Sequence, residues 1–328
     1  MKMTRFAKFV WVVLAINLLV ILWGAVVRAT GSGAGCGAHW PLCTGEVVPA
    51  SPQLETLIEL FHRITSGLAL ILVVVMLIGA FRAHPKGHPV RTGAALAMVF
   101  MLLESLVGAF IVLMRLTGND TSAGRAAVIA VHQVNTLLLI GAIVLTGWWA
   151  MGGGRIRLRG QGALAVMLVI GLAGLIVIGA TGAITALGDT LFPASSLVQG
   201  LEQKFEPGAH FLVRLRIVHP TQAVIMAVYV TALAQQVARR AGNDTARRAA
   251  RVLLGLFFGQ LVLGAVNVAL LAPVWMQLAH LLMADLVWIA FTLLSVSALS
   301  ASQVEVKPAT VDARAAGVVQ TAQPQARA

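Results

Sequence analysis

Eight long apolar runs restrict this chain of 328 residues to a membrane-spanning fold. Allowing for short interruptions, each run has about the 20 residues that a helix needs to cross the hydrocarbon core of a bilayer. The runs are continuous and do not alternate between apolar and polar residues, so they indicate helices rather than a transmembrane β-barrel. They lie at 8–29, 62–81, 92–114, 126–150, 162–186, 211–237, 250–271 and 276–300. The sequence therefore predicts an all-α integral membrane protein with eight transmembrane helices.

The net charge of +12 is distributed in a way that indicates membrane topology. Basic residues gather before the first run and in every second connection between runs. Alternating helices place these segments on one side, which the positive-inside rule makes the cytoplasm. We therefore expect a multi-pass protein of the bacterial plasma (inner) membrane with both termini in the cytoplasm, and no nucleic-acid binding. The basic residues concerned are Lys2, Arg5, Lys8, Arg82, Lys86, Arg91, Arg155, Arg157, Arg159, Arg239, Arg240, Arg247, Arg248 and Arg251.

The second half of the chain repeats features of the first. The matched features are Gly24 to Gly31 with Gly179 to Gly188, Glu104 to Ala109 with Gln260 to Ala265, His62 with His219, and His132 with His280. A repeat of four helices returns the chain to its starting side, so the two halves share one orientation. We expect two four-helix-bundle repeats related by a pseudo-two-fold axis along the membrane normal. The expected divisions are an N-terminal repeat at 1–151, a cytoplasmic linker at 152–161, a C-terminal repeat at 162–300 and a disordered cytoplasmic tail at 301–328.

Four histidines lie in the outer parts of the even-numbered runs: His62, His132, His219 and His280. A single histidine of this kind is usually a hydrogen-bonded core residue. Four at matched positions favour a shared function, because polar side chains at such depths are costly and usually face a bundle interior. Two histidines on two helices can hold a flat metal macrocycle from both faces. We therefore predict one haem between His62 and His132, and another between His219 and His280.

Only the first of these two sites has an acidic residue at its edge. Glu59 lies three residues before His62, on the same face of a helix, whereas Arg216 lies three before His219. This difference suggests chemistry at the first site and electron relay at the second. Arginines beside the sites could pair with haem propionates, or contact lipid headgroups. They are Arg28, Arg63, Arg214 and Arg216.

The two cysteines, Cys36 and Cys43, fall in the first outer loop with Gly and Pro between them. An extracytoplasmic loop lies in an oxidising compartment, so we expect a disulfide. It is either a structural staple or part of a redox or haem-handling device.

The motifs together resemble those of haem A synthases, over all eight runs from about 8 to 300. They are Gly24-Ala-Val-Val-Arg28-Ala-Thr-Gly31-Ser-Gly33 followed by Cys36, Trp40, Pro41 and Cys43; Glu59-Leu-Phe-His62-Arg63; Val131-His132-Gln; Ile217-Val-His219-Pro; and Gln277-Leu-Ala-His280-Leu-Leu. The resemblance implies that haem O is the substrate and that its ring methyl is oxidised in successive steps to a formyl group. The product would be haem A for terminal oxidases.

The same resemblance implies a haem b cofactor in the C-terminal half and substrate in the N-terminal half. Carried onto this chain, His219 and His280 bind the cofactor and His62 and His132 the substrate. We expect Glu59 to work beside the reacting methyl. The loop between the fifth and sixth runs has no cysteines, unlike that of some relatives, so a redox role that needs a second pair is not available.

The resemblance further suggests a homo-oligomer, and the low solubility of haem favours contact with haem O synthase. The electron donor is not identified by the sequence. Two other functions fit parts of the pattern. A non-catalytic di-haem b-type electron carrier needs only the four histidines, and a transporter with parallel repeats would hold no iron.

Overall fold

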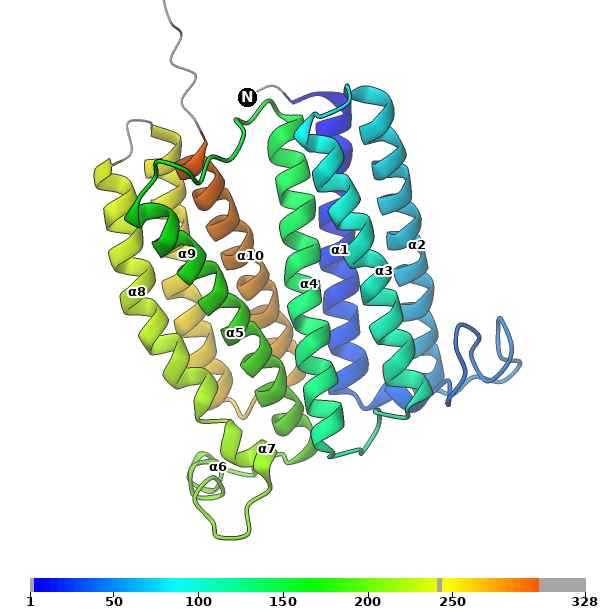
Figure 1. Ribbon diagram of the computed structural model, residues 1–328. Coiled ribbons are helices and arrows are strands. Elements are labelled where there is room, and N and C mark those ends of the chain that lie inside the picture. Colours follow the sequence, from blue (N-terminus) through cyan, green and yellow to red (C-terminus); the bar gives the residue numbers. More distant parts are fainter. Residues whose placement is uncertain (1–2, 241–243, 301–328) are drawn as a thin grey trace, which may run out of the picture.

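The computed structural model describes residues 3–240 and 244–300, and within these the chain is helical with eight helices long and apolar enough to cross a membrane. The predicted all-α fold with eight spans is confirmed; the tail at 301–328 lies outside the described residues. Figure 1 shows the helices as a bundle, with long connections between α1 and α2 and between α5 and α8. The long helices are α1 (Arg5–Ala29), α2 (Leu54–Ala83), α3 (Pro89–Leu113), α4 (Ala123–Ala150), α5 (Ala163–Leu191), α8 (Val218–Arg240), α9 (Asp244–Ala269) and α10 (Val274–Leu299). Shorter ones are η1 (Ser32–Ala34), α6 (Leu197–Glu202) and α7 (Phe211–Leu215).

Local sequence signals fix where several helices begin. The hydroxyl oxygen of Thr4 accepts the backbone N–H of Ala7 at the start of α1, and Ser122 does the same for Arg125 at the start of α4. Such caps satisfy backbone donors that have no partner inside the helix. Pro89 opens α3, where its missing N–H costs nothing.

Helix α2 begins earlier than the apolar run predicts, at Leu54 instead of 62. Its first turns contain Glu55, Glu59 and Arg63, which lower the local hydropathy. Glu59 and Arg63 are nevertheless bonded to the preceding loop and to each other. Hydropathy alone places the start of this helix too late because it takes no account of such partners.

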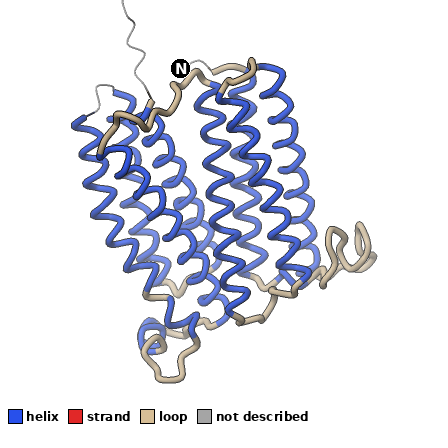
Figure 2. The backbone as a smooth tube through the Cα atoms, viewed as in Figure 1, coloured by secondary structure: helices blue, strands red, loops and turns tan. Residues whose placement is uncertain are grey.

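The helices form two groups that meet where α4 packs on α5 and α10 and where α1 packs on α10. Helices α1 to α4 pack on one another, and α5, α8, α9 and α10 form the second group (Figures 1 and 2). At the seam the indole N–H of Trp288 on α10 donates to the carbonyl of Leu137 on α4 at 2.7 Å, and the indole lies over Gly141. Helices α4 and α10 are accordingly the most buried of the eight. The symmetry between the groups stays a prediction.

The two ends of the bundle differ in their connections. The beginning of α1 lies at the same end as the α2–α3 and α4–α5 connections, which contain many of the basic residues (Figure 1). The α4–α5 connection is fastened to the end of α10, because Ile156 bridges to Ser300 and the N–H of Arg157 donates to the carbonyl of Leu299 at 3.0 Å. The loop after α1, η1, α6 and α7 lie at the opposite end. The four histidines lie nearer this opposite end.

Candidate functional site

His219 on α8 and His280 on α10 face each other in the second group of helices. Their ring centres are 6.3 Å apart and the ring planes are nearly perpendicular, at 87°. A metal ion bonded to one nitrogen of each ring, with bonds of about 2 Å as in zinc–imidazole sites, would place the ring centres roughly 6 Å apart. The spacing therefore fits a haem iron that both histidines would hold.

A backbone contact favours one tautomer of His219. Its Nδ1 lies 3.2 Å from the carbonyl oxygen of Ile178. When Nδ1 carries the proton and donates it there, Nε2 keeps a lone pair that can bind metal. Among the described residues no group of three or more His, Cys, Asp and Glu side chains is placed to hold a metal ion. A porphyrin supplies its own further ligands, so two histidines are enough for haem.

Two glycines make room for these rings. A Cβ added at Gly182 on α5 would lie 2.9 Å from Cε1 of His219, and one at Gly264 on α9 would lie 3.0 Å from Cε1 of His280. The side-chain nitrogen of Gln260 lies 3.2 Å from Nε2 of His280. Each histidine thus rests against the backbone of a neighbouring helix, which limits how its ring can turn.

His62 on α2 has a similar setting in the first group of helices. A Cβ at Gly24 on α1 would lie 3.0 Å from its Cε1, just as Gly182 backs His219. No ring-to-ring contact joins His62 to His132 in the described part of the chain, unlike the pair His219 and His280. The first pair is therefore less closely associated than the second.

His132 on α4 lies beside a carboxylate to which the sequence analysis assigned no role. Its Nδ1 is 3.4 Å from Oε1 of Glu104 on α3, within ion-pair distance but without the geometry of a hydrogen bond. Asn135 and Thr136 donate side-chain hydrogen bonds to the two carboxylate oxygens of Glu104. Glu104 is the position that matches Gln260, which contacts His280. The match between Glu104 and Gln260 in the two halves of the sequence was the signal from which a role for Glu104 could have been predicted.

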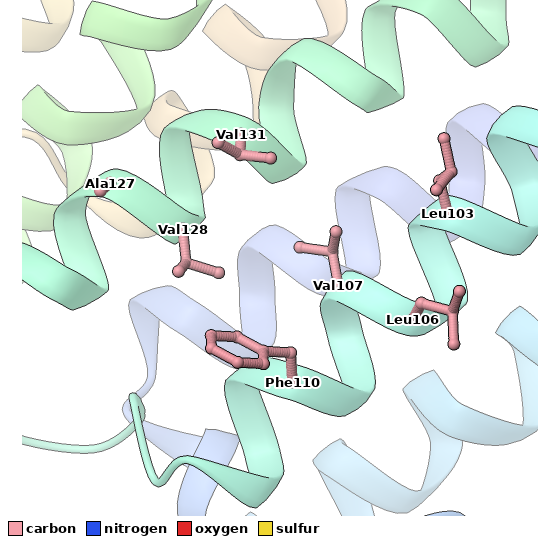
Figure 3. A pocket seen from close by; sticks show the side chains of 7 residues that line it. All are labelled: Leu103, Leu106, Val107, Phe110, Ala127, Val128 and Val131. Carbon is pink, nitrogen blue, oxygen red and sulfur yellow. The ribbon is translucent and has the colours of Figure 1, made fainter.

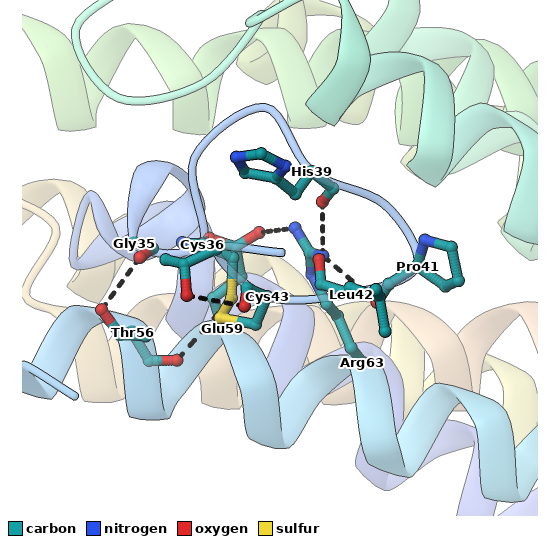
Figure 4. Close-up of a disulfide and its surroundings, with 10 residues drawn as sticks. Gly35, Cys36, His39, Pro41, Leu42, Cys43, Thr56, Glu59 and Arg63 are labelled. Atoms are coloured by element: carbon teal, nitrogen blue, oxygen red, sulfur yellow. Dashed lines mark hydrogen bonds and ion pairs between the residues drawn. A yellow bond between two sulfur atoms is a disulfide. The ribbon is translucent and has the colours of Figure 1, made fainter. Parts of the chain in front are cut away.

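Glu59 is buried, with 3% of its surface exposed, and is bonded to the loop that precedes α2. Its Oε2 accepts the backbone N–H of Cys36 at 2.8 Å, and its Oε1 pairs with Arg63 (Figure 4). Arg63 in turn donates to the carbonyls of His39 and Leu42, each at 2.6 Å. The pair Glu59–Arg63 therefore fastens the loop to the helix that carries His62. The expected role of Glu59 in chemistry stays a prediction.

The predicted disulfide between Cys36 and Cys43 is present in this loop (Figure 4). Next to it, Gly35 lies so close to α2 that an added Cβ would come within 2.5 Å of the backbone of Glu55. Thr56 donates its hydroxyl to the carbonyl of Gly35 at 2.9 Å. Loop and helix are thus joined by several contacts at one point.

The arginines predicted near the sites all donate to main-chain carbonyls: Arg28, Arg63, Arg214 and Arg216. Arg216 also pairs with Asp189 at 2.8 Å. Arg28 reaches α5 and α10 from α1. Sequence reasoning missed Arg125, which is buried and donates to the carbonyls of Gly118 and Asp120. Pairing of the four predicted arginines with propionates stays a prediction.

An apolar groove runs between α3 and α4, the helices that carry Glu104 and His132. It has a volume of about 350 Å³ and is lined by Leu103, Leu106, Val107, Phe110, Ala127, Val128 and Val131 (Figure 3). Leu103 and Val131 directly precede Glu104 and His132 in the sequence. The groove therefore lies on the two helices that bring Glu104 and His132 together.

Comparisons with known proteins identify the family to which the chain belongs. A protein of Thermus thermophilus named "Protoheme IX farnesyltransferase" is 54% identical over 296 residues, which are 90% of this chain and 49% of that protein. A "Heme A synthase" of Bacillus mycoides is 40% identical over 144 residues, which are 44% of each chain. The chain thus spans about half the length, or less, of these curated relatives. The family described as "Cytochrome oxidase assembly protein" matches residues 7–292. Because this match covers most of the sequence, the chain belongs to the COX15-CtaA family of cytochrome oxidase assembly proteins.

Proposed function

We propose that this chain is a haem A synthase, an oxidoreductase that converts the ring methyl of haem O to a formyl group in successive steps. Membership of the COX15-CtaA family supports this activity. The single observation that carries the proposal is that the rings of His219 and His280 face each other with their centres 6.3 Å apart. The other group of helices carries a second pair of histidines. The product, haem A, would serve terminal oxidases.

We assign haem b to His219 and His280, and the substrate haem O to His62 and His132. The bound haem b would supply one-electron transfer. The closer approach of the second pair suits a permanent cofactor, and the looser first pair suits a substrate that enters and leaves. Ile178 holds the proton on Nδ1 of His219, which leaves Nε2 for the iron. Gly24 and Gly182 seat the rings of His62 and His219.

In the first site, two carboxylates have different tasks. Glu104 is turned toward His132 by Asn135 and Thr136, and attracts the proton of that ring to Nδ1. Glu59 is placed at the loop end of α2, one turn from His62, and we retain it as the residue that exchanges protons near the reacting methyl. The apolar groove between α3 and α4 gives an apolar substrate an approach from the lipid.

We also propose the repeat architecture, with 1–151 as the substrate half, 152–161 as the linker and 162–300 as the cofactor half. The basic end of the bundle would face the cytoplasm of a bacterium. The Thermus thermophilus relative is named for farnesyl transfer to protohaem IX, and the matched part is only 49% of its length. This supports contact between the present chain and the enzyme that makes haem O. A homo-oligomer and an external electron donor complete the proposal.

The test is to purify the protein from cells that make haem O and to identify the porphyrins extracted from it. We expect haem b together with haem O, haem A or the hydroxylated precursor of haem A. In His62→Ala only haem b should remain, and in His219→Ala the haem b content should fall. Haem b alone in the unaltered protein, with no haem A formed, would instead identify a di-haem electron carrier. A colourless protein would contradict both functions.

A further inference from the structure

Arg28 makes hydrogen bonds from the first group of helices to two helices of the second. It stands in the last turn of α1. Its Nη1 donates to the carbonyl of Ala186 and to the hydroxyl of Thr190 on α5, each at 2.7 Å. Its Nη2 donates to Oε1 of Gln277 on α10 at 2.8 Å. One guanidinium therefore holds three acceptors on two helices of the other group.

On α1 and α10, Arg28 and its partner each stand one turn from a histidine site. Gly24, which touches His62, lies four residues before Arg28 on α1. Gln277 lies three residues before His280 on α10. Residues three or four apart share one face of a helix. The contact between Arg28 and Gln277 therefore connects the faces that carry the two sites.

Helix α5, which Arg28 also contacts, carries part of the cofactor site. Ala186 lies four residues after Gly182, the glycine that seats His219 on α5. Gln277 is itself held, because its side-chain nitrogen donates to the carbonyl of Ala272 at 2.6 Å. Movement of Arg28 would thus change contacts on α5, which carries Gly182, and on α10, which carries His280.

Arg125 is an arginine with comparable hydrogen bonds that do not reach the other group of helices. It lies at the same end of the bundle, and its Nη1 also donates to two oxygen atoms. Those atoms are the carbonyls of Gly118 and Asp120, in the same group of helices as Arg125 itself. It therefore serves as a matched residue that has comparable bonds and no bridge.

We propose that Arg28 is a positioning residue that couples the two haem sites. In one state its guanidinium is bonded to Thr190 and Gln277, as in the structure. In the other state, some of its N–H groups donate instead to an anionic propionate of the porphyrin in the first site. Pairing between carboxylate and guanidinium groups favours this second state. Binding of substrate thereby alters the redox potential of the haem held by His219 and His280. The inference rests on the proposed function.

The test uses the full chain with its resident haem b, and zinc protoporphyrin IX as a probe for the first site. This probe carries propionates, and its metal is not reduced when the haem is titrated. We expect the midpoint potential of the haem to shift when the probe binds. In Arg28→Lys the shift should be lost even when the probe is present at saturating concentration, since a lysine cannot reproduce the planar fork of an arginine. Arg125→Lys should keep the shift.

The acceptors provide a second set of variants that leaves Arg28 in place. Gln277→Leu should abolish the shift, and Thr190→Val should reduce it, so these two decide the matter if Arg28→Lys fails to fold. Retention of the full shift in Arg28→Lys or Gln277→Leu would overturn the inference, as would an unchanged potential in the unaltered protein with probe bound. Failure of the purified protein to hold haem would overturn the proposed function as well. Haem A formation without a shift would overturn the coupling alone.

Discussion

At the scale of single residues, the polar contacts of the site come from positions far apart in the sequence. Glu104 on α3 meets His132, Asn135 and Thr136 on α4. The sequence showed a carboxylate inside an apolar run and a histidine inside another. It could not show that they touch, because that depends on how α3 and α4 are rotated against each other.

Replacing Glu104 by Gln tests whether this carboxylate orients His132. The amide keeps the size of the side chain but removes the charge that attracts the ring N–H, and loss of such partners typically lowers metal affinity about 10- to 100-fold. We expect haem binding at the first site to weaken in that range, while haem at His219 and His280 is unaffected. Haem titration followed by absorption measures both. Unchanged affinity at the first site would rule out the orienting role.

Replacing Glu59 by Gln or Ala distinguishes its proposed role in proton exchange from its role in anchoring the loop. The amide of Gln still accepts the N–H of Cys36 and so keeps the loop in place, but it cannot exchange a proton as a carboxylate does. We expect both variants to bind haem and to stop forming haem A, measured by pigment extraction. Glu46→Ala, on an exposed residue of the same loop, is the control. Activity retained in Glu59→Gln and lost in Glu59→Ala would make Glu59 a loop anchor only.

At the scale of helices, small residues decide where side chains can lie. Continuous hydropathy predicted the spans, since any helix in lipid must satisfy its backbone internally and be apolar outside. The glycines at the histidines were visible as recurring motifs, yet their partners were not. Gly24 touches His62 and Gly182 touches His219 only because α1 approaches α2, and α5 approaches α8, closely at these points.

Gly182→Ala should disturb the cofactor site. The new Cβ would lie 2.9 Å from His219, so the ring must shift, and such overpacking costs about 1–3 kcal/mol. We expect lower haem b occupancy and a changed absorption spectrum in the purified protein. Gly255→Ala on α9 is the matched control because its Cβ would meet nothing within 4 Å. Equal haem content in both variants would show that the Gly182 contact does not matter.

At the scale of the whole molecule, the seam between α4 and α10 is one of the contacts that hold the two groups of helices together, beside the packing of α4 on α5. The number of spans and the depth of the histidines followed from composition and repeat spacing. The seam did not, because Trp288, Leu137 and Gly141 are ordinary membrane residues until the two helices are brought face to face. The bridge from Arg28 to α5 and α10 was missed for the same reason.

Gly141→Leu should weaken the seam, whereas Gly141→Ala should be tolerated. A Cβ at this position would lie 3.5 Å from the indole nitrogen of Trp288, an ordinary contact, but the further carbons of leucine would collide with the ring. We expect a loss of stability of about 1–3 kcal/mol for the leucine variant. Thermal unfolding of the two variants in the same detergent measures this. Similar midpoints would contradict the assigned packing.

The fastening of the α4–α5 connection to the end of α10 has a consequence for how the protein can be built. Since Ile156 and Arg157 are tied to Ser300 and Leu299, the connection is anchored at its start, and the exposed residues that follow, such as Leu158 and Arg159, add only chain continuity. A backbone cut there would leave α1 to α4 in one fragment and α5 to α10 in the other. Each fragment would then keep one of the two helices, α4 or α10, that meet at the seam. Two separately translated polypeptides could therefore meet in the bilayer and re-form the same bundle.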